Sequence, residues 1–275
     1  MGARVLVDGA AVEQVSALDR GLAYGDGLFE SIRLVGAVAP LWSRHMRRLD
    51  EGCRRLRMPA PDAGRLWHEA LQVSHDMAQS VVRITVTRGL GQRGYAPPAV
   101  TEPTRIVAAF APPPASADVY LHGVRMRLCS LRLAEQPLLA GMKHLNRLEQ
   151  VLARAEWDDP AIAEGVLCDG RGRVISATMA NLFAVVDGQL LTPALDRCGV
   201  AGVARAEVLS VLPQARVGEL MLDALLRATE VFLSSSVRGI LPVQSLAERV
   251  YEPGALSRQL QQHWRKLGFS MEHGG

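Results

Sequence analysis

Lysine is nearly absent from this chain. Of its 31 basic residues only Lys143 and Lys266 are lysines, so the other 29 are arginines. Arginine supplies a permanent charge, whereas a lysine amine can also form a Schiff base with a carbonyl group. Lys266 lies in a polar stretch near the C-terminus, which is typical of a solvated helix. The scarcity of lysine therefore singles out Lys143 as a candidate for amine chemistry.

Other absences narrow the class of protein. No apolar run approaches the length of a membrane span, and the first residues lack the apolar core of a secretion signal. The four cysteines are widely separated, and neither they nor the seven histidines show metal-ligand spacing. A net charge of +3 without basic runs gives nucleic-acid binding little support. We therefore expect a cytoplasmic protein with reduced thiols, no metal, no membrane contact and no nucleic-acid partner.

The apolar pattern predicts two domains joined by a proline-rich linker. Residues 1–111 contain an expected hairpin with an Asp8-Gly9 turn, helices over 41–58 and 64–74, and two apolar strands over 81–89 and 104–111. Residues 112–118 include three consecutive prolines from 112 to 114 and form the predicted linker. Residues 119–275 alternate strands and helices, with Asp-Gly hairpin turns at 169–170 and 187–188.

Lys143 follows an apolar, glycine-containing approach and precedes an expected helix. That helix would carry Leu145, Leu148, Leu152 and Ala155 on one face. A lysine held partly desolvated there would have a lowered pKa, as Schiff-base chemistry requires. An ordinary surface lysine near a helix start would have the same position, so the position of Lys143 alone does not decide its role.

Several segments in order carry a resemblance to a known family. They are DRGLAYGDGLFES at residues 19–31, the helix segment from His45 to Leu49, GQRGY at 91–95, GMKHLNRLEQVLARAEW at 141–157, and a long-spaced pattern from Ser176 to Arg205. Together they resemble the fold-type-IV pyridoxal-phosphate enzymes of the class-IV aminotransferase family, and within it the aminodeoxychorismate lyases. The resemblance implies a D-amino-acid aminotransferase-like chain with an α+β N-terminal and an α/β C-terminal domain. It also implies pyridoxal 5'-phosphate at the domain interface, and a homodimer.

The resemblance also assigns the cofactor site. Lys143 would hold the cofactor covalently, Arg48 would bind its phosphate, and Val200 would pack on its ring. The turn at Val203 and Ala204 starts a helix whose N–H groups suit a phosphate, although relatives often have threonine at position 204. The remaining matches are the hydroxyl of Ser236, which would also contact the phosphate, and residues 178–180, which would form the strand beside the cofactor.

Ser176 departs from the family pattern. The family normally has a glutamate there, which pairs with the protonated ring nitrogen of the cofactor. A neutral serine would leave that nitrogen mostly unprotonated, which should impair transamination more than an elimination that ends in an aromatic ring. We hypothesise that Ser176 favours lyase over aminotransferase chemistry. A weakened enzyme is the alternative explanation.

The resemblance implies a lyase that converts 4-amino-4-deoxychorismate into 4-aminobenzoate and pyruvate, a step of folate synthesis. Lys143 would be the catalytic base, and Arg93 and Tyr24 would contact the substrate, although a solvated Arg93 and a packing role for Tyr24 fit equally well. Three alternatives remain open. They are a D-amino-acid or branched-chain aminotransferase of the same fold, a catalytically weak pyridoxal-phosphate-binding protein, and a binding module without cofactor.

Overall fold

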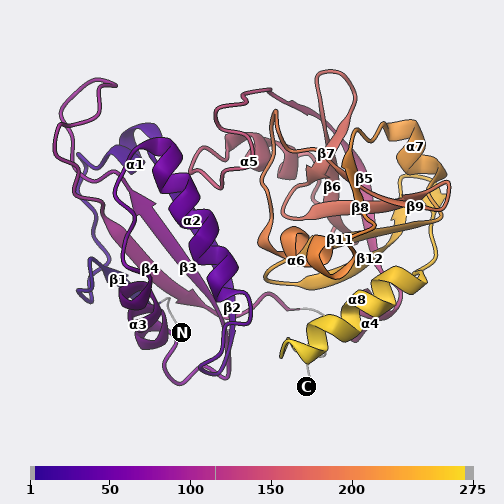
Figure 1. Cartoon of the computed structure of the whole chain (residues 1–275), viewed down its shortest axis with the longest axis horizontal. Helices are drawn as coiled ribbons and strands as arrows, with labels where there is room; N and C mark the ends of the chain where they lie inside the picture. Colours follow the sequence, from indigo (N-terminus) through magenta and orange to yellow (C-terminus); the bar gives the residue numbers. More distant parts are fainter. Residues whose placement is uncertain (1–3, 115, 270–275) are drawn as a thin grey trace. The chain divides into compact units, whose positions relative to one another are not determined.

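The computed structural model describes residues 4–114 and 116–269 and divides into two compact units (Figure 1). The first unit runs to Pro113 and also includes Met142–Asn146, and the second unit comprises the remainder. The segment that carries Lys143 thus belongs to the first unit, although it comes later in the chain. Residue 115 of the expected linker and residues 1–3 and 270–275 of the expected domains lie outside the described residues.

The first unit is built on a four-stranded antiparallel sheet in the order β1-β4-β3-β2. Its helices are α1 (Arg20–Tyr24), α2 (Trp42–Leu56) and α3 (Ala63–Val73). Its strands are β1 (Arg4–Val7), β2 (Gly27–Val35), β3 (Gln79–Thr87) and β4 (Arg105–Phe110).

Alternation along the strands separates the two faces of this sheet. Ile32 of β2 pairs with Val82 of β3, and both side chains are buried. Side chains of α2 and α3 reach this buried face, because Arg48 donates to Glu30 of β2 and Glu69 accepts from Arg105 of β4. The intervening residues, among them Phe29, Ser31 and Arg83, therefore point to the opposite face.

The second unit contains a nine-stranded mixed sheet. Its main path is β10-β9-β8-β11-β12-β5-β6-β7, with β13 paired to β12. The pairs β10–β9, β12–β5 and β5–β6 are parallel, and the other neighbours are antiparallel. The strands are β5 (Val124–Leu133), β6 (Ile162–Asp169), β7 (Val174–Ala177), β8 (Asn181–Val186), β9 (Gln189–Pro193), β10 (Arg216–Gly218), β11 (Glu230–Ser235), β12 (Gly239–Leu246) and β13 (Arg249–Val250).

Five helices accompany this sheet: α4 (Ala117–Leu121), α5 (Leu148–Arg154), α6 (Val203–Val211), α7 (Leu222–Arg227) and α8 (Ala255–Lys266). The core includes stacked rings of Phe183 and Phe232, whose centroids lie 5.0 Å apart. The chain's four cysteines are buried and free, and burial raises the pKa of Cys53 to about 12. Within the described residues, no helix is long and apolar enough to cross a membrane.

Three expected elements differ from the structure. Residues 178–180, expected as a strand, form a bend after the end of β7 at Ala177. The Asp8-Gly9 turn forms with both residues at positive φ, but β1 pairs with β4, and the expected second strand is reduced to a single bridge between Ala10 and Val7. The helix expected directly after Lys143 starts only at Leu148, and Leu148 and Leu152 are 76% and 61% exposed. The expected helix forms from Leu148 onward, and its apolar side chains Leu148 and Leu152 are exposed within the described chain.

Candidate active site

Lys143 lies on a segment that pairs with β2 at the edge of the sheet of the first unit. The backbone N–H of Phe29 donates to the carbonyl oxygen of Lys143 at 2.9 Å, and the N–H of Leu145 donates to the carbonyl oxygen of Gly27 at 3.0 Å. His144 forms an antiparallel bridge with Leu28. The half-buried Lys143 side chain places its Nζ 4.3 Å from the centroid of the Phe29 ring. The lysine is therefore fixed by backbone pairing to an edge strand, rather than by a helix.

Gly27 is required for this pairing. A Cβ at Gly27 would lie 2.5 Å from the carbonyl oxygen of Val86 and 2.9 Å from the Leu145 side chain. The side-chain amide of Asn146 adds a hydrogen bond of 3.2 Å to the Gly25 carbonyl. The glycines around Tyr24 that stand out in the sequence thus permit the lysine segment to approach β2 closely.

Arg48 is held by a buried carboxylate. Its Nε donates to Glu30 Oε1 at 2.8 Å, and its Nη2 donates to Glu30 Oε2. His45 Nδ1 lies 2.6 Å from the same Oε2, and the side chains of Glu30 and His45 are each 1% exposed. Burial alone would raise the pKa of Glu30, but Arg48 and His45 outweigh it and hold that pKa at about 2. Glu30 is therefore ionised near neutral pH.

The electrostatics of His45 complete this cluster. Burial, helped by the positive charges of Arg48 and Lys143, lowers the pKa of His45 below its ordinary value although Glu30 raises it, so the imidazole is neutral near pH 7. One carboxylate then balances one guanidinium, and the neutral imidazole binds the same carboxylate. The sequence analysis assigned Arg48 but missed Glu30 as its partner. A signal existed, because a glutamate inside the apolar strand GLFESIRL must have a partner when it is buried.

In the second unit, the start of α6 offers backbone donors without a side-chain cap. Gly202 occupies the N-cap position and makes no side-chain cap hydrogen bond, while Val203 and Ala204 are buried. Orphan N–H groups at a helix start suit an anion and need no particular side chain. The lack of a side-chain hydroxyl at Ala204 therefore leaves this feature intact.

Asn181 sets the shape of the turn before α6. Its side-chain nitrogen donates to the Val200 carbonyl at 2.9 Å, and its Oδ1 accepts from the Gly202 N–H at 3.0 Å. A Cβ at Gly202 would lie 2.0 Å from that Oδ1, so only glycine fits. Val200 is also bridged to Gly141, two residues before Lys143. Asn181 thus brings Val200 together with the start of α6.

Ser236 lies in the turn that joins β11 and β12. The hydroxyl of Ser235 accepts from the N–H groups of Val237 and Arg238 at 3.3 and 3.4 Å. The Arg238 guanidinium donates to the fully buried Glu164 of β6. Residues 235–238 are therefore anchored from both the backbone and the side chains.

Glu164 also binds residues 178 and 179, which follow β7. Its carboxylate accepts from the Thr178 hydroxyl and from the Met179 N–H, the latter at 3.1 Å. Thr178 follows β7, where Ser176 is buried opposite Leu167. The sequence analysis missed Glu164, although it is a carboxylate within a mostly apolar strand. This carboxylate links the Ser236 turn to residues 178–179.

Tyr24 supports the loop that carries Arg93. The Tyr24 hydroxyl accepts from the Gly94 N–H at 3.1 Å. Arg20, which the sequence analysis did not single out, is 4% exposed and donates to the Gly94 and Tyr95 carbonyls at 2.9 and 3.0 Å. The Arg93 side chain itself is exposed. Substrate contacts by Tyr24 and Arg93 remain predictions.

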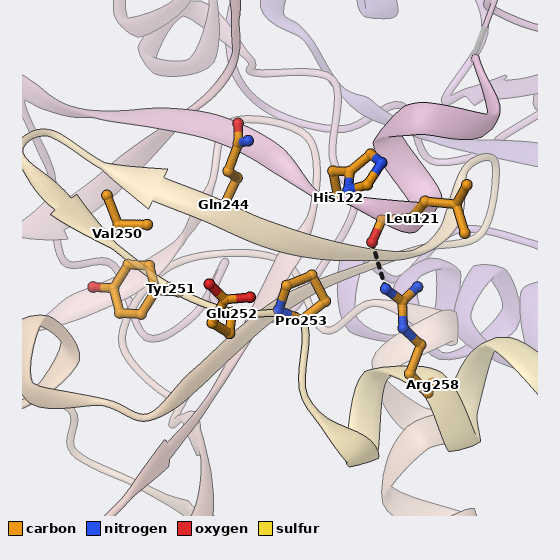
Figure 2. A pocket seen from close by; sticks show the side chains of 8 residues that line it. All are labelled: Leu121, His122, Gln244, Val250, Tyr251, Glu252, Pro253 and Arg258. Carbon is orange, nitrogen blue, oxygen red and sulfur yellow. Dashed lines mark hydrogen bonds between the residues drawn. The ribbon is translucent and has the colours of Figure 1, made fainter.

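Figure 2 shows a pocket in the second unit that is separate from these residues. It has a volume of about 430 Å³, and it is lined by Leu121, His122, Gln244, Val250, Tyr251, Glu252, Pro253 and Arg258. Arg258 donates to the carbonyl oxygens of Tyr120 and Leu121, so its guanidinium is engaged in joining α8 to α4. None of the predicted site residues lines this pocket, and we assign it no role. No cluster of potential metal ligands occurs in residues 4–114 and 116–269.

Comparison with known proteins identifies the family. Residues 27–246 match the family model described as amino-transferase class IV, and the chain belongs to this family. It is 36% identical over 263 residues to an aminodeoxychorismate lyase of Vibrio harveyi, covering 93% of this chain and 97% of the relative. The family and the two-domain fold expected from the sequence are thereby confirmed.

Solved structures extend the comparison. The 4-amino-4-deoxychorismate lyase of Pseudomonas aeruginosa is 47% identical, with a TM-score of 0.91 over 95% of this chain and 98% of that one. A branched-chain aminotransferase of the thermophilic archaeon Thermoproteus uzoniensis, solved with norvaline, has a TM-score of 0.85 over 99% of this chain and 97% of that one. At 22% identity, this second similarity concerns the fold alone.

Proposed function

We propose that this protein is a pyridoxal-phosphate-dependent lyase that converts 4-amino-4-deoxychorismate into 4-aminobenzoate and pyruvate. The observation that carries the proposal is its end-to-end similarity to two lyases, at 36% and 47% identity. The position of Lys143, the only lysine other than one exposed on α8, is consistent with it.

The residues present fit pyridoxal 5'-phosphate. The start of α6 presents buried, uncapped N–H groups to an anion, and the Ser176 hydroxyl makes no hydrogen bond within the described chain. We propose that Lys143 binds the cofactor aldehyde, that Val203, Ala204, Ser236 and Arg48 bind the phosphate, and that Val200 and Ser176 contact the ring.

When bound, the cofactor supplies an aldehyde that condenses with amines and a ring that accepts electrons from the neighbouring carbon. The amine of Lys143 would act as the general base and remove the proton from the substrate's ring carbon that bears the nitrogen. The bond between the adjacent carbon and the enolpyruvyl oxygen breaks, and the six-membered ring becomes aromatic. The departing enolpyruvate would gain a proton on its methylene carbon and become pyruvate.

We also propose that the protein is a cytoplasmic homodimer. Leu148, Val151 and Leu152 of α5 are between 59% and 76% exposed, and such a cluster of apolar side chains suits a subunit contact. The four free cysteines suit a reducing compartment.

The test exploits the scarcity of lysine. The purified, cofactor-loaded protein is incubated with 4-amino-4-deoxychorismate, and 4-aminobenzoate and pyruvate are both quantified. We expect equal amounts from the wild type and from Lys266→Ala, whose lysine is exposed on α8, and none from Lys143→Ala. Conversion of keto acids to amino acids without release of 4-aminobenzoate would instead identify an aminotransferase.

A further inference from the structure

Two segments of the second unit continue beyond the end of the β8–β11 ladder. The last pair of this ladder joins Asn181 of β8 to Ser234 of β11. Residues 178–180 precede Asn181, and the Ser236 turn (residues 235–238) follows Ser234. Because the two strands are antiparallel, both segments extend from the same end of the ladder. Their relative position is therefore set by contacts other than the β8–β11 pairing.

A buried carboxylate joins the two segments. Glu164 of β6 accepts from the Thr178 hydroxyl and the Met179 N–H in the first segment. In the second segment its donor is the Arg238 guanidinium. The side chain of Glu164 is 0% exposed and that of Arg238 is 18% exposed. In the sheet β6 lies between β5 and β7, so this link between residues 178–179 and the Ser236 turn is made by side chains and not by strand pairing.

Arg238 is bound at both its backbone and its side chain. The Tyr120 hydroxyl of α4 donates to the Arg238 carbonyl oxygen at 3.0 Å, and Glu164 binds the guanidinium. Loss of the carboxylate would leave the Tyr120 contact but would release the Arg238 side chain and leave its charge without this partner. Since Ser236 lies two residues before Arg238, the position of its hydroxyl depends on the ion pair.

The end of the same ladder carries an unpartnered hydroxyl. Ser234 is 1% exposed, and its Oγ has no hydrogen-bond partner within residues 4–114 and 116–269. Ser234 lies directly opposite Asn181, so both side chains are on one face of the sheet. On that face the Asn181 amide binds Val200 and Gly202 at the start of α6. A buried hydroxyl without a partner is destabilising, so a polar ligand is expected on this face.

We propose that Glu164 is a positioning residue for the cofactor's phosphate. Through Arg238 it holds the Ser236 turn, and through its other two hydrogen bonds it holds residues 178–179 beside that turn. A carboxylate repels a phosphate, so Glu164 acts through the turn and not by direct contact. This inference rests on the proposed function, in which the Ser236 hydroxyl binds the phosphate.

The test measures equilibrium binding to the full chain freed of cofactor, which requires no turnover. Glu164→Gln keeps the size of the side chain but removes the charge that binds Arg238. Binding of pyridoxal 5'-phosphate should weaken about tenfold, the scale of one hydrogen bond to a charged group, while binding of pyridoxal, which lacks the phosphate, should not change. Asp223→Asn, which removes an exposed ion pair with Arg227 in the same unit, is the matched control and should bind both ligands as the wild type does.

A double-mutant cycle asks whether Glu164 acts through Ser236. In the Ser236→Ala background, Glu164→Gln should weaken binding of pyridoxal 5'-phosphate by no more than about twofold, because the contact that Glu164 positions is already lost. Arg238→Met should reproduce the loss seen in Glu164→Gln, and Arg238→Lys, which keeps the charge, should recover part of it. The two Arg238 variants test the same link if Glu164→Gln does not fold.

Three results would overturn the role of Glu164. The first is an unchanged affinity for pyridoxal 5'-phosphate in Glu164→Gln. The second is an equal loss of affinity for pyridoxal, which would indicate a general structural role. The third is a full additive loss in the Ser236→Ala background, which would mean that Glu164 acts independently of the Ser236 turn. A wild type that binds the cofactor but lacks lyase activity would refute the proposed function instead, and the cycle would still test Glu164.

Discussion

The two units hold their site residues by different means. In the first unit, buried charges are paired by side chains: Glu30 binds Arg48 and His45, and Asp26 binds Arg20 and Arg88 at 2.9 and 2.7 Å. In the second unit, the start of α6 relies on backbone N–H groups, and the side-chain amide of Asn181 fixes their direction. Charge pairs depend on pH and on both partners, whereas backbone donors depend only on local geometry. The two units should therefore respond differently to substitution and to acid.

The largest effect on stability is expected at Glu30. Glu30→Gln removes the buried carboxylate that balances Arg48, and breaking a buried ion pair from one side typically costs about 3 kcal/mol. Chemical denaturation should show this loss at pH 7. Glu51→Gln on the same helix as Arg48 is the matched control, because Glu51 pairs with Arg54 in an exposed position and should matter little.

The pH dependence of the free energy of unfolding of the same variant tests whether Glu30 is ionised in the folded protein. The pKa of Glu30 is about 2 in the folded protein and about 4.3 in an unfolded chain. Its contribution is therefore fully present above the unfolded value and is lost as the pH falls from about 4 to about 2. The stability difference between the wild type and Glu30→Gln should narrow over that interval. A difference that stays constant down to pH 2 would contradict the ionised Glu30.

A smaller effect, on the affinity for the cofactor's phosphate, is expected at Gly202. Gly202→Ala would place a methyl group 2.0 Å from Asn181 Oδ1 and displace the first turn of α6. Affinity for pyridoxal 5'-phosphate should fall about tenfold, the loss of a hydrogen bond to a charged group, while affinity for pyridoxal, which lacks the phosphate, should not. Gly170→Ala is the control, because a Cβ there meets open space. Equal losses for both ligands would argue against a phosphate site at α6.

The smallest effect, on the fraction of turnovers that end in transamination, is expected at Ser176. Ser176→Glu should raise the pKa of the cofactor's ring nitrogen and so increase the small fraction of turnovers that end in transamination. Ser176→Ala, which adds no charge, should leave that fraction unchanged. The measurement is the amino acid formed per 4-aminobenzoate released. No increase in the glutamate variant would refute the hypothesis that Ser176 favours lyase chemistry.

Local sequence patterns predicted many of the elements but few of the contacts. Helical spacing placed α2 and α3 to within about two residues, because each has its own apolar stripe. The short helices α1, α4 and α7 and the strands β10, β12 and β13 were missed. All of these except β12 have six residues or fewer, which is too short for a clear periodic pattern. Strand β12 reads as a nearly continuous apolar run because most of it is buried.

The candidate site shows the same division. Lys143 was singled out as a candidate from the sequence, because a residue type that is almost absent is informative wherever it remains. Arg48 became a candidate only through a resemblance, since five other arginines between residues 44 and 57 surround it. Glu30 and Glu164 were overlooked, because their importance depends on partners 14 or more residues away along the chain.

The sequence by itself determined which side chains are available for chemistry: one conspicuous lysine, a serine in place of a glutamate, and glycines where the backbone must pass closely. Only the tertiary structure decided which of them meet. The register of β2 with β3, and of the lysine segment with β2, places Phe29 beside both Lys143 and Arg83. Strand register is a cooperative property of paired chains, and a shift of one residue would turn every one of these side chains to the opposite face.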